Sequence, residues 1–235
     1  MTVAPVTSRF ADALLDGLAL LLPVECAGCG APDRAVCARC RPALTPDPSS
    51  RLLGPDRLPV FTGLDYDGVA RDVLLAFKEQ GRTELARHLA PPLAAAVREA
   101  IASHGLRGVE LVSVAGSRRA RRGRGFDPVA MLVSRAGLDR ARVFAPARPH
   151  PAQKTLSLEQ RSANLAGVFE VRVPVTGRRF LVIDDVVTTG ATLLAAAEAL
   201  RVAGAEVVAA AAVASTPRLF GSSVGVHRER SVTFP

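Results

Sequence analysis

The feature that most constrains the fold is the segment from Phe180 to Thr192, an apolar run that ends in two acids and a hydroxyl-rich turn. Its continuous apolar start predicts a strand that is covered on both faces, as in a parallel sheet. The residues that follow, 193–203, are rich in Ala and Leu and predict a helix that ends before Gly204. A strand, turn and helix in this order favour an α/β fold.

The turn between this strand and this helix predicts a phosphate site. Backbone N–H groups at a helix N-terminus lack intrahelical partners, and together with several hydroxyls they bind phosphate oxygens. An ordinary helix cap would need one Asp or Thr and not the whole set. The acids repel phosphate, so we expect them to bind ribose hydroxyls, directly or beside Mg²⁺. The predicted site comprises Asp184 and Asp185 with the phosphate-binding residues Val187, Thr188, Thr189, Gly190, Ala191 and Thr192.

Composition limits the classes of protein that this chain can belong to. Its 235 residues have room for one α/β domain and a small appendage, and 49% of them are hydrophobic, enough for a sizeable core. Only 4% are aromatic, so platforms for stacking single-stranded bases are scarce. The net charge of +8 is compatible with nucleic acid or with polyphosphate substrates.

The N-terminal apolar segment does not predict a membrane span or a signal peptide. Asp12 and Asp16 interrupt the stretch 10–24, which is also shorter than the roughly eighteen apolar residues that a span needs. We therefore expect a short amphipathic helix from Arg9 to Leu22 in a cytoplasmic protein.

Four cysteines within fifteen residues predict a structural Zn²⁺ site. Two Cys-x-x-Cys pairs, separated by seven residues, can direct four thiolates at one tetrahedral ion. Redox-active dithiols or disulfides are the alternatives, and a cytoplasmic setting disfavours persistent disulfides. Four ligands close the ion to substrate, so catalysis by this metal is not expected. The predicted ligands are Cys26, Cys29, Cys37 and Cys40.

The remaining pattern alternates strands and helices after a predicted linker at 41–59, which is rich in Pro, Ser and Asp. We expect segment 168–173 to pair with 180–183 across the turn between them. The other expected strands are 60–66, 109–115, 142–147 and 207–214, and the expected helices are 69–77, 83–103 and 127–135.

Two polar segments follow predicted strands. The first, 116–126, places five arginines among three glycines and predicts a pyrophosphate loop, because guanidinium groups fork onto phosphate oxygens. A solvated loop and a nucleic-acid patch are the alternatives; its position at the carboxyl end of a strand favours a ligand site. The second, 148–165, predicts a lid that shields a reactive sugar pyrophosphate from water. The arginines are Arg118, Arg119, Arg121, Arg122 and Arg124.

These elements together resemble the ComF family of competence-associated, phosphoribosyltransferase-like proteins. The resemblance rests on the four cysteines, the two segments Phe77-Lys78 with Gly81 and 122–126, the segment 153–156, and the 184–192 motif. Arg161, Asn164 and Phe169 follow the 153–156 segment. The family implies a type I phosphoribosyltransferase fold, with a mostly parallel sheet flanked by helices. It also implies a zinc-binding N-terminal segment and a link to DNA uptake in natural transformation.

The resemblance gives further expectations. It implies a zinc-knuckle segment over 1–50 and a phosphoribosyltransferase-like domain over 51–235. It adds Lys78 to the substrate-facing groups, and Gln153, Lys154 and Arg161 as lid residues. The ligand would be phosphoribosyl pyrophosphate (PRPP) or ribose-5-phosphate with Mg²⁺.

Two functions remain open on these expectations. One is transfer of phosphoribose to an unidentified acceptor, with release of pyrophosphate. The other is a non-catalytic role beside single-stranded DNA or a DNA-uptake helicase. Two departures from the family pattern flank the arginine loop: 112–115 reads Val-Ser-Val-Ala instead of Val-Pro-Val-Pro, and Asp127-Pro128 replaces Asn-Gln. A plain zinc-dependent DNA-binding protein is disfavoured, because the basic cluster lies in a strand–helix loop with few aromatics nearby.

Overall fold

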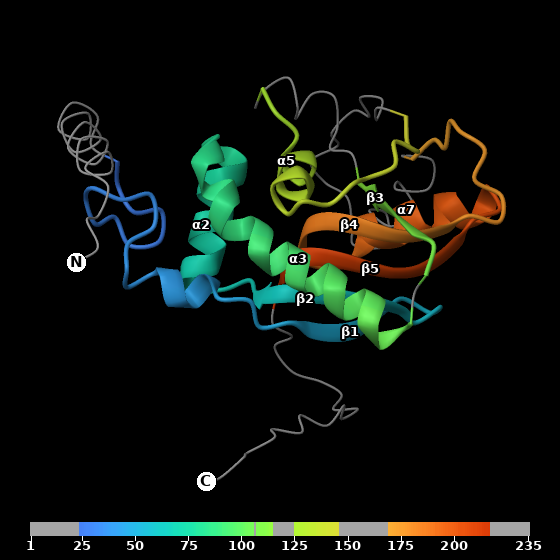
Figure 1. Ribbon diagram of the computed structural model, residues 1–235, viewed down its shortest axis with the longest axis horizontal. Coiled ribbons are helices and arrows are strands. Elements are labelled where there is room, and N and C mark those ends of the chain that lie inside the picture. The colour runs from blue at the N-terminus through green and yellow to red at the C-terminus, as the bar shows by residue number, and fades with distance from the viewer. Residues whose placement is uncertain (1–23, 106, 115–124, 146–168, 217–235) are drawn as a thin grey trace, which may run out of the picture.

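The protein folds around one five-stranded sheet with the strand order β1-β2-β5-β4-β3 (Figure 1). The computed structural model describes residues 24–105, 107–114, 125–145 and 169–216. Four strands run parallel, and only β1, at one edge, is antiparallel to its neighbour. The strands are β1 (Ser49–Leu53), β2 (Leu58–Asp65), β3 (Val109–Ser113), β4 (Arg179–Val187) and β5 (Glu206–Ser215). This sheet confirms the expected α/β class.

Helices cover both faces of the sheet (Figure 1). On one face, α2, α3 and α5 share a core with the side chains of Leu181 and Ile183. On the other face, α7 shares a core with those of Phe180 and Val182. The helices are α2 (Gly68–Glu79), α3 (Ala86–Ser103), α5 (Pro128–Arg135) and α7 (Ala191–Val202), with short 3₁₀ turns η1 (Arg41–Leu44) and η2 (Thr83–Leu85).

The central position of β4 explains its sequence. All four residues of the apolar run 180–183 are completely buried, because helices cover both faces of the strand and β3 and β5 flank its edges. Half of the residues of its partner β5 are alanine, and small side chains allow close approach of neighbouring elements. On β2 the approach is closest at Gly63, where a Cβ atom would collide with the carbonyl oxygen of Pro92 in α3.

The predicted linker at 41–59 was wrong. This segment contains η1 and all of β1, and it ends inside β2. Gly54 and Arg57 have positive φ angles and form the turn that folds β1 back onto β2. The polar composition misled because β1 is an edge strand, whose outer side chains face solvent. The expected domain boundary at residue 50 lies within β1.

The predicted strand at 142–147 and the predicted pairing of 168–173 with 180–183 were also wrong. Within the described part of these segments, residue 144 pairs with residue 171 in an isolated antiparallel bridge. The N–H of Ala145 donates to the carbonyl of Glu170 at 2.7 Å. Segment 169–173 cannot pair with β4, because β3 and β5 occupy both edges of that strand.

Among the helices of the described residues, none combines the length and the hydropathy that a bilayer span requires. The expected amphipathic helix at 9–22 lies outside the described residues.

Candidate functional site

The acidic pair lies near the carboxyl end of β4, where ligands bind in open parallel sheets. The strand continues two residues beyond the acids to Val187, and the turn 188–190 then leads into α7. Gly190 takes a left-handed conformation with a φ angle of 79°, which its lack of a side chain permits. Thr188 and Thr189 are exposed beside it, and the Thr189 hydroxyl accepts the N–H of Ala191 at 3.3 Å.

Asp185 is held by Lys78, which reaches it from the last turn of α2. The Lys78 Nζ lies 3.0 Å from Oδ1 and 2.9 Å from Oδ2 of Asp185. The Asp185 side chain is 8% exposed and that of Lys78 32%, so the ion pair is shielded from water mainly on the acid's side. The family resemblance predicted Lys78 as a substrate-facing group, and the structure gives it a carboxylate partner beside the turn that follows β4.

Asp184 is half-buried and carries a perturbed carboxyl group. Burial and then the adjacent Asp185 charge raise the pKa of Asp184 to about 7, against the N–H bond from Asp185 and the Lys78 charge, which lower it. A carboxyl with this pKa exchanges its proton near neutral pH. Its charge state therefore responds to any cation or hydrogen-bond donor that a ligand brings.

Arg51 is a residue of this site that no sequence motif marks. From β1 it crosses the end of the sheet and donates to the carbonyl oxygens of Val187 at 3.3 Å and Thr188 at 3.2 Å. A further bond of 3.5 Å reaches the carbonyl of Thr216, directly after β5. A guanidinium group thus fixes the start of the predicted phosphate loop. No local signal marked Arg51, because its segment was interpreted as a linker.

Leu53, also in β1, packs against the other end of the loop. A Cβ atom built on Gly190 would collide with the Leu53 side chain, which is 4% exposed. β1 therefore contacts the 187–190 segment at both ends: Arg51 donates hydrogen bonds to residues 187 and 188, and Leu53 packs against Gly190.

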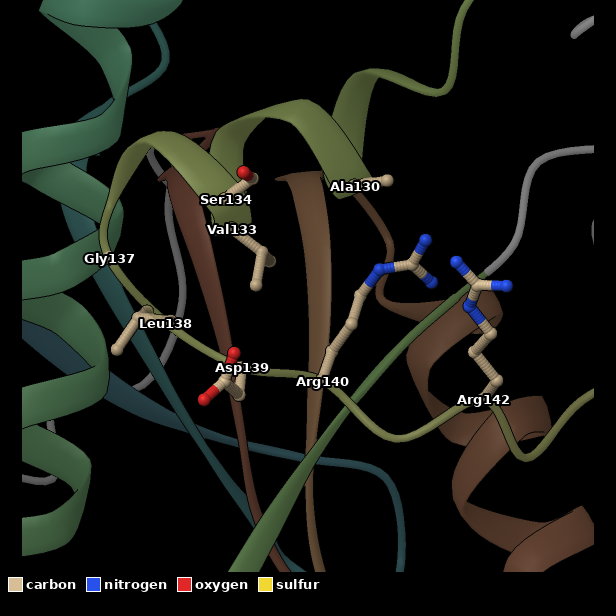
Figure 2. A pocket seen from close by; sticks show the side chains of 8 residues that line it. All are labelled: Ala130, Val133, Ser134, Gly137, Leu138, Asp139, Arg140 and Arg142. Carbon is tan, nitrogen blue, oxygen red and sulfur yellow. The ribbon is translucent and has the colours of Figure 1, made fainter.

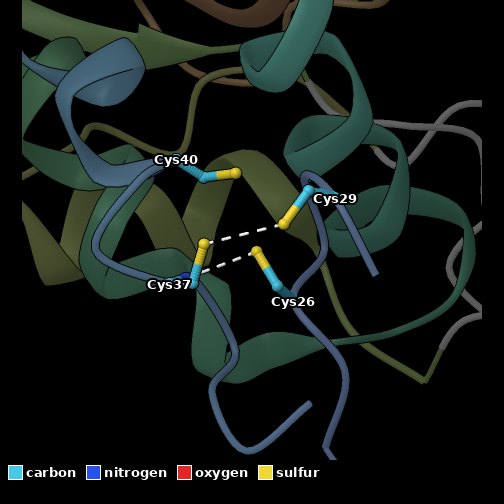
Figure 3. A group of neighbouring side chains, drawn as sticks. All are labelled: Cys26, Cys29, Cys37 and Cys40. Atoms are coloured by element: carbon cyan, nitrogen blue, oxygen red, sulfur yellow. Dashed lines mark hydrogen bonds between the residues drawn. The ribbon is translucent and has the colours of Figure 1, made fainter. Parts of the chain in front are cut away.

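The four cysteines converge as their spacing predicted (Figure 3). Their four Sγ atoms lie within 4.8 Å of one another, and those of Cys29 and Cys37 are 3.6 Å apart. Four sulfurs at about 2.3 Å from one tetrahedral ion would be about 3.8 Å apart. Each Cys-x-x-Cys pair forms a tight turn, with N–H groups donating to the carbonyls of Cys26 and Cys37. The cluster can hold a metal ion such as zinc.

The thiols of this cluster differ in acidity. Burial opposes ionisation of Cys26, but N–H groups, including that of Cys37 at 3.3 Å (Figure 3), lower its pKa to about 6. Burial and the neighbouring thiols raise the pKa of Cys40 to about 12. A dication would offset the mutual repulsion of four thiolates, which explains why such a donor set suits a metal.

The cysteine segment packs directly on the helix that carries Lys78. Cys26 and Cys40 are buried in the same core as Val73 of α2, and a Cβ on Gly28 would lie 2.8 Å from Val69. The predicted metal site therefore supports α2 from its N-terminal end.

Several predicted site residues lie outside the described residues, but their flanking elements are placed. Asp127, after the arginine loop, caps α5 by accepting the N–H of Ala130 at 3.0 Å, and Pro128 begins the helix. Asp127 therefore fills the N-cap position that the Asn of the family pattern would also fill, because Asp and Asn are both good N-caps. The residues outside are Arg118, Arg119, Arg121, Arg122, Arg124, Gln153, Lys154 and Arg161.

The chain is similar to several known proteins. A family model described as Phosphoribosyl transferase domain matches residues 140–219. The DNA utilization protein YhgH of Escherichia coli K12 is 30% identical over 194 residues, which cover 78% of this chain and 80% of that protein. An adenine phosphoribosyltransferase of Novosphingobium aromaticivorans is 43% identical over 63 residues, covering 25% of this chain and 35% of that enzyme. The crystal structure of orotate phosphoribosyltransferase from Aeropyrum pernix, 20% identical, has a TM-score of 0.33 and covers 75% of this chain and 78% of that one.

The parallel sheet, the acidic strand end and the domain match define a phosphoribosyltransferase-like protein. Within that class the chain belongs to the ComF family, together with YhgH.

Proposed function

We propose that this chain binds PRPP or ribose-5-phosphate at the turn between β4 and α7. The observation that carries the proposal is the pair of acids on β4, two residues before a turn of hydroxyls and backbone N–H groups at the start of a helix. In this arrangement the 5-phosphate lies on the 187–192 loop, where the N–H groups and the helix dipole favour negative charge. Arg51 adds positive charge beside the same loop.

The two carboxylates bind the ribose. Each oxygen of an ionised carboxylate accepts hydrogen bonds, so Asp184 and Asp185 suit the neighbouring ribose hydroxyls. Lys78 orients the Asp185 carboxylate through the bonds of 2.9 and 3.0 Å. Hydroxyl donors from the ribose would favour the ionised form of Asp184, and binding would then release a proton near pH 7.

Transfer of phosphoribose follows if an acceptor binds beside this ribose. The bond between the anomeric carbon and pyrophosphate breaks, the acceptor's lone pair forms the new bond, and the acceptor loses a proton. Positive charge builds on the ribose and negative charge on the departing pyrophosphate. The carboxylates stabilise the first charge, and the predicted arginine loop 118–124 stabilises the second. Bound to the diphosphate, Mg²⁺ would supply further neutralising charge.

Calorimetry at pH 8 tests the binding proposal. We expect Asp184→Asn/Asp185→Asn to raise the Kd for PRPP with Mg²⁺ about tenfold or more, because charged hydrogen bonds of about 1.5–3 kcal/mol each are lost. The control Asp72→Asn/Glu198→Gln removes two exposed negative charges elsewhere and should bind as the wild type does. Equal, negligible heats for the wild type and the acidic-pair variant would reject the proposal.

We further propose that the cysteine cluster holds one structural Zn²⁺. The Sγ spacing of 3.6 Å and the two tight turns support this assignment. Metal analysis of reduced protein should find about one zinc per chain, and Cys29→Ser/Cys37→Ser should bring it well below one, because two ligands remain. Restoration of zinc after chelation of the wild type serves as the control. Well under one zinc in carefully reduced wild type would contradict the assignment.

A non-catalytic role in DNA handling is the second candidate. It is favoured by the relative named for DNA utilization and by the place of the cysteine cluster, which packs against α2 through the buried Cys26 and Cys40 and not at the β4–α7 turn. Its partner would be single-stranded DNA or a helicase of DNA uptake. Pyrophosphate release from PRPP, screened over purines, pyrimidines and small amines, separates the two candidates, since only an enzyme releases it.

A further inference from the structure

We propose that a pocket beside α5 binds the phosphate group of a small metabolite, at a site separate from the β4–α7 loop. The pocket has a volume of about 390 Å³ and lies between α5 and the extended segment 138–142 (Figure 2). Its lining is Ala130, Val133, Ser134, Gly137, Leu138, Asp139, Arg140 and Arg142.

The backbone places the two arginines on one side of their segment. The N–H of Ala141 donates to the carbonyl of Leu111 at 2.7 Å, which fixes this residue against the β3 edge. Residues two apart in an extended segment point to the same side, so Arg140 and Arg142 both project into the pocket. Arg140 is fixed further by a 2.9 Å bond to the hydroxyl of Ser113.

The charges in the pocket favour an anion. In the described part of the chain, neither arginine forms an ion pair, although six other cations do. Asp139 lines the pocket, but its carboxylate points away from both guanidinium groups (Figure 2). Two guanidinium groups in one pocket repel each other unless they share a counter-charge. A phosphate suits them, because each guanidinium can donate two parallel hydrogen bonds to its oxygens.

The size and the remaining polar groups indicate more than inorganic phosphate. Small-molecule sites typically enclose about 300–1,000 Å³, and this volume falls in that range. The Ser134 hydroxyl and the Asp139 carboxylate can bind hydroxyl or amine groups of the rest of the ligand. We therefore assign the site to a phosphorylated sugar or nucleotide.

This pocket is distinct from the proposed ribose-phosphate site. Among the residues that the structure describes, none lines both sites, and their helices α5 and α7 pack on opposite faces of the sheet. The inference consequently stands whether or not the β4–α7 loop binds PRPP.

Arginine-selective modification by phenylglyoxal, read residue by residue with mass spectrometry, tests the site. Inorganic pyrophosphate in Mg²⁺-free buffer serves as the probe. We expect saturating pyrophosphate to slow modification of Arg140 and Arg142 at least threefold, while the exposed Arg98 reacts at an unchanged rate. The same protection should persist in Asp184→Asn/Asp185→Asn, because the pocket does not use the acids.

Direct binding provides the second measurement. By equilibrium dialysis, Arg140→Gln/Arg142→Gln should bind less pyrophosphate than the wild type, whereas Arg98→Gln/Arg107→Gln, which loses the same charge from exposed positions, should not. Unprotected arginines, or equal binding by both double variants, would overturn the inference. Protection that disappears in the acidic-pair variant would also overturn it, since the arginines would then belong to the ribose-phosphate site.

Discussion

The substitution Gly190→Ala is expected to destabilise the fold by about 3 kcal/mol and to weaken PRPP binding about a hundredfold. Two costs add at this position. A left-handed residue with a Cβ costs about 1–2 kcal/mol, and the φ angle here is 79°. The new methyl group also collides with Leu53, and overpacking costs about 1–3 kcal/mol. The turn can relieve the backbone strain or the collision with Leu53 only by shifting, and a shift would misalign the N–H groups of 188–192.

Gly177→Ala is the matched control for the first of these costs. Gly177 has a φ angle of 73°, but a Cβ there would meet no atom within 4 Å. It should therefore lose only about 1 kcal/mol in chemical denaturation and keep full affinity for PRPP. The difference between the two variants measures the contact with Leu53.

A double-mutant cycle separates the collision from backbone strain. Leu53→Ala alone should cost about 2–4 kcal/mol, because the side chain is buried. Combined with Gly190→Ala, it removes the colliding group, so the double variant should be more stable than the sum of the single losses by about 1 kcal/mol. Strict additivity would show that Leu53 does not press on the loop.

The core of the site was predictable because its signals are local. The apolar run before Asp184 predicts a buried strand, and the hydroxyl-rich turn with Gly190 predicts a ligand loop at a helix start. The cysteine spacing predicts a metal cluster in the same way, since two tight turns suffice to bring the sulfurs together. Each of these inferences depends on fewer than about twenty neighbouring residues.

The surroundings of the site depend on contacts between distant parts of the chain. Arg51 reaches Thr188 over 137 residues, and only the pairing of β1 with β2 brings it there. A Ser- and Pro-rich segment gives no sign of that pairing, because an edge strand needs few buried side chains. The predicted strand at 142–147 failed for the opposite reason. An apolar pattern is present, but within the described part of 138–147 only residue 141 bridges to β3.

The arginine pair at 140 and 142 carried a signal that could have been used. Two arginines two residues apart, in an extended segment directly after a helix, project to one side and can share an anion. Whether a pocket faces them depends on how α5 packs, which the sequence alone does not specify.

Loss of the lysine in Lys78→Met is expected to cost about 2 kcal/mol at pH 8 and to weaken PRPP binding about thirtyfold. Removal of one partner from a buried ion pair costs about 3–5 kcal/mol, and the 32% exposure of Lys78 reduces this through solvent screening. Binding falls further because Asp185 loses the group that orients it. Lys78→Arg keeps the positive charge and should retain part of the fold stability and part of the PRPP affinity.

The pH dependence identifies the electrostatic origin of this loss. The Lys78 charge lowers the pKa of Asp184, so the pKa should rise above about 7 in Lys78→Met. A carboxyl with a raised pKa stabilises the fold when protonated, and that stability is lost as pH rises from the unfolded value of about 4 through the folded one. The stability gap between Lys78→Met and wild type should therefore widen from pH 5 to pH 8 in chemical denaturation.

A second substitution tests whether the lost stability comes from leaving the Asp185 carboxylate without its cation. Lys78→Met/Asp185→Asn removes both charges, so no buried carboxylate is left without its cation, and most of the lost stability should return. PRPP binding should not return, because the ribose loses a carboxylate acceptor. If the added Asp185→Asn leaves stability as low as in Lys78→Met, the ion pair does not account for the loss. Lys78 would then contribute mainly through the packing of its side chain at the end of α2.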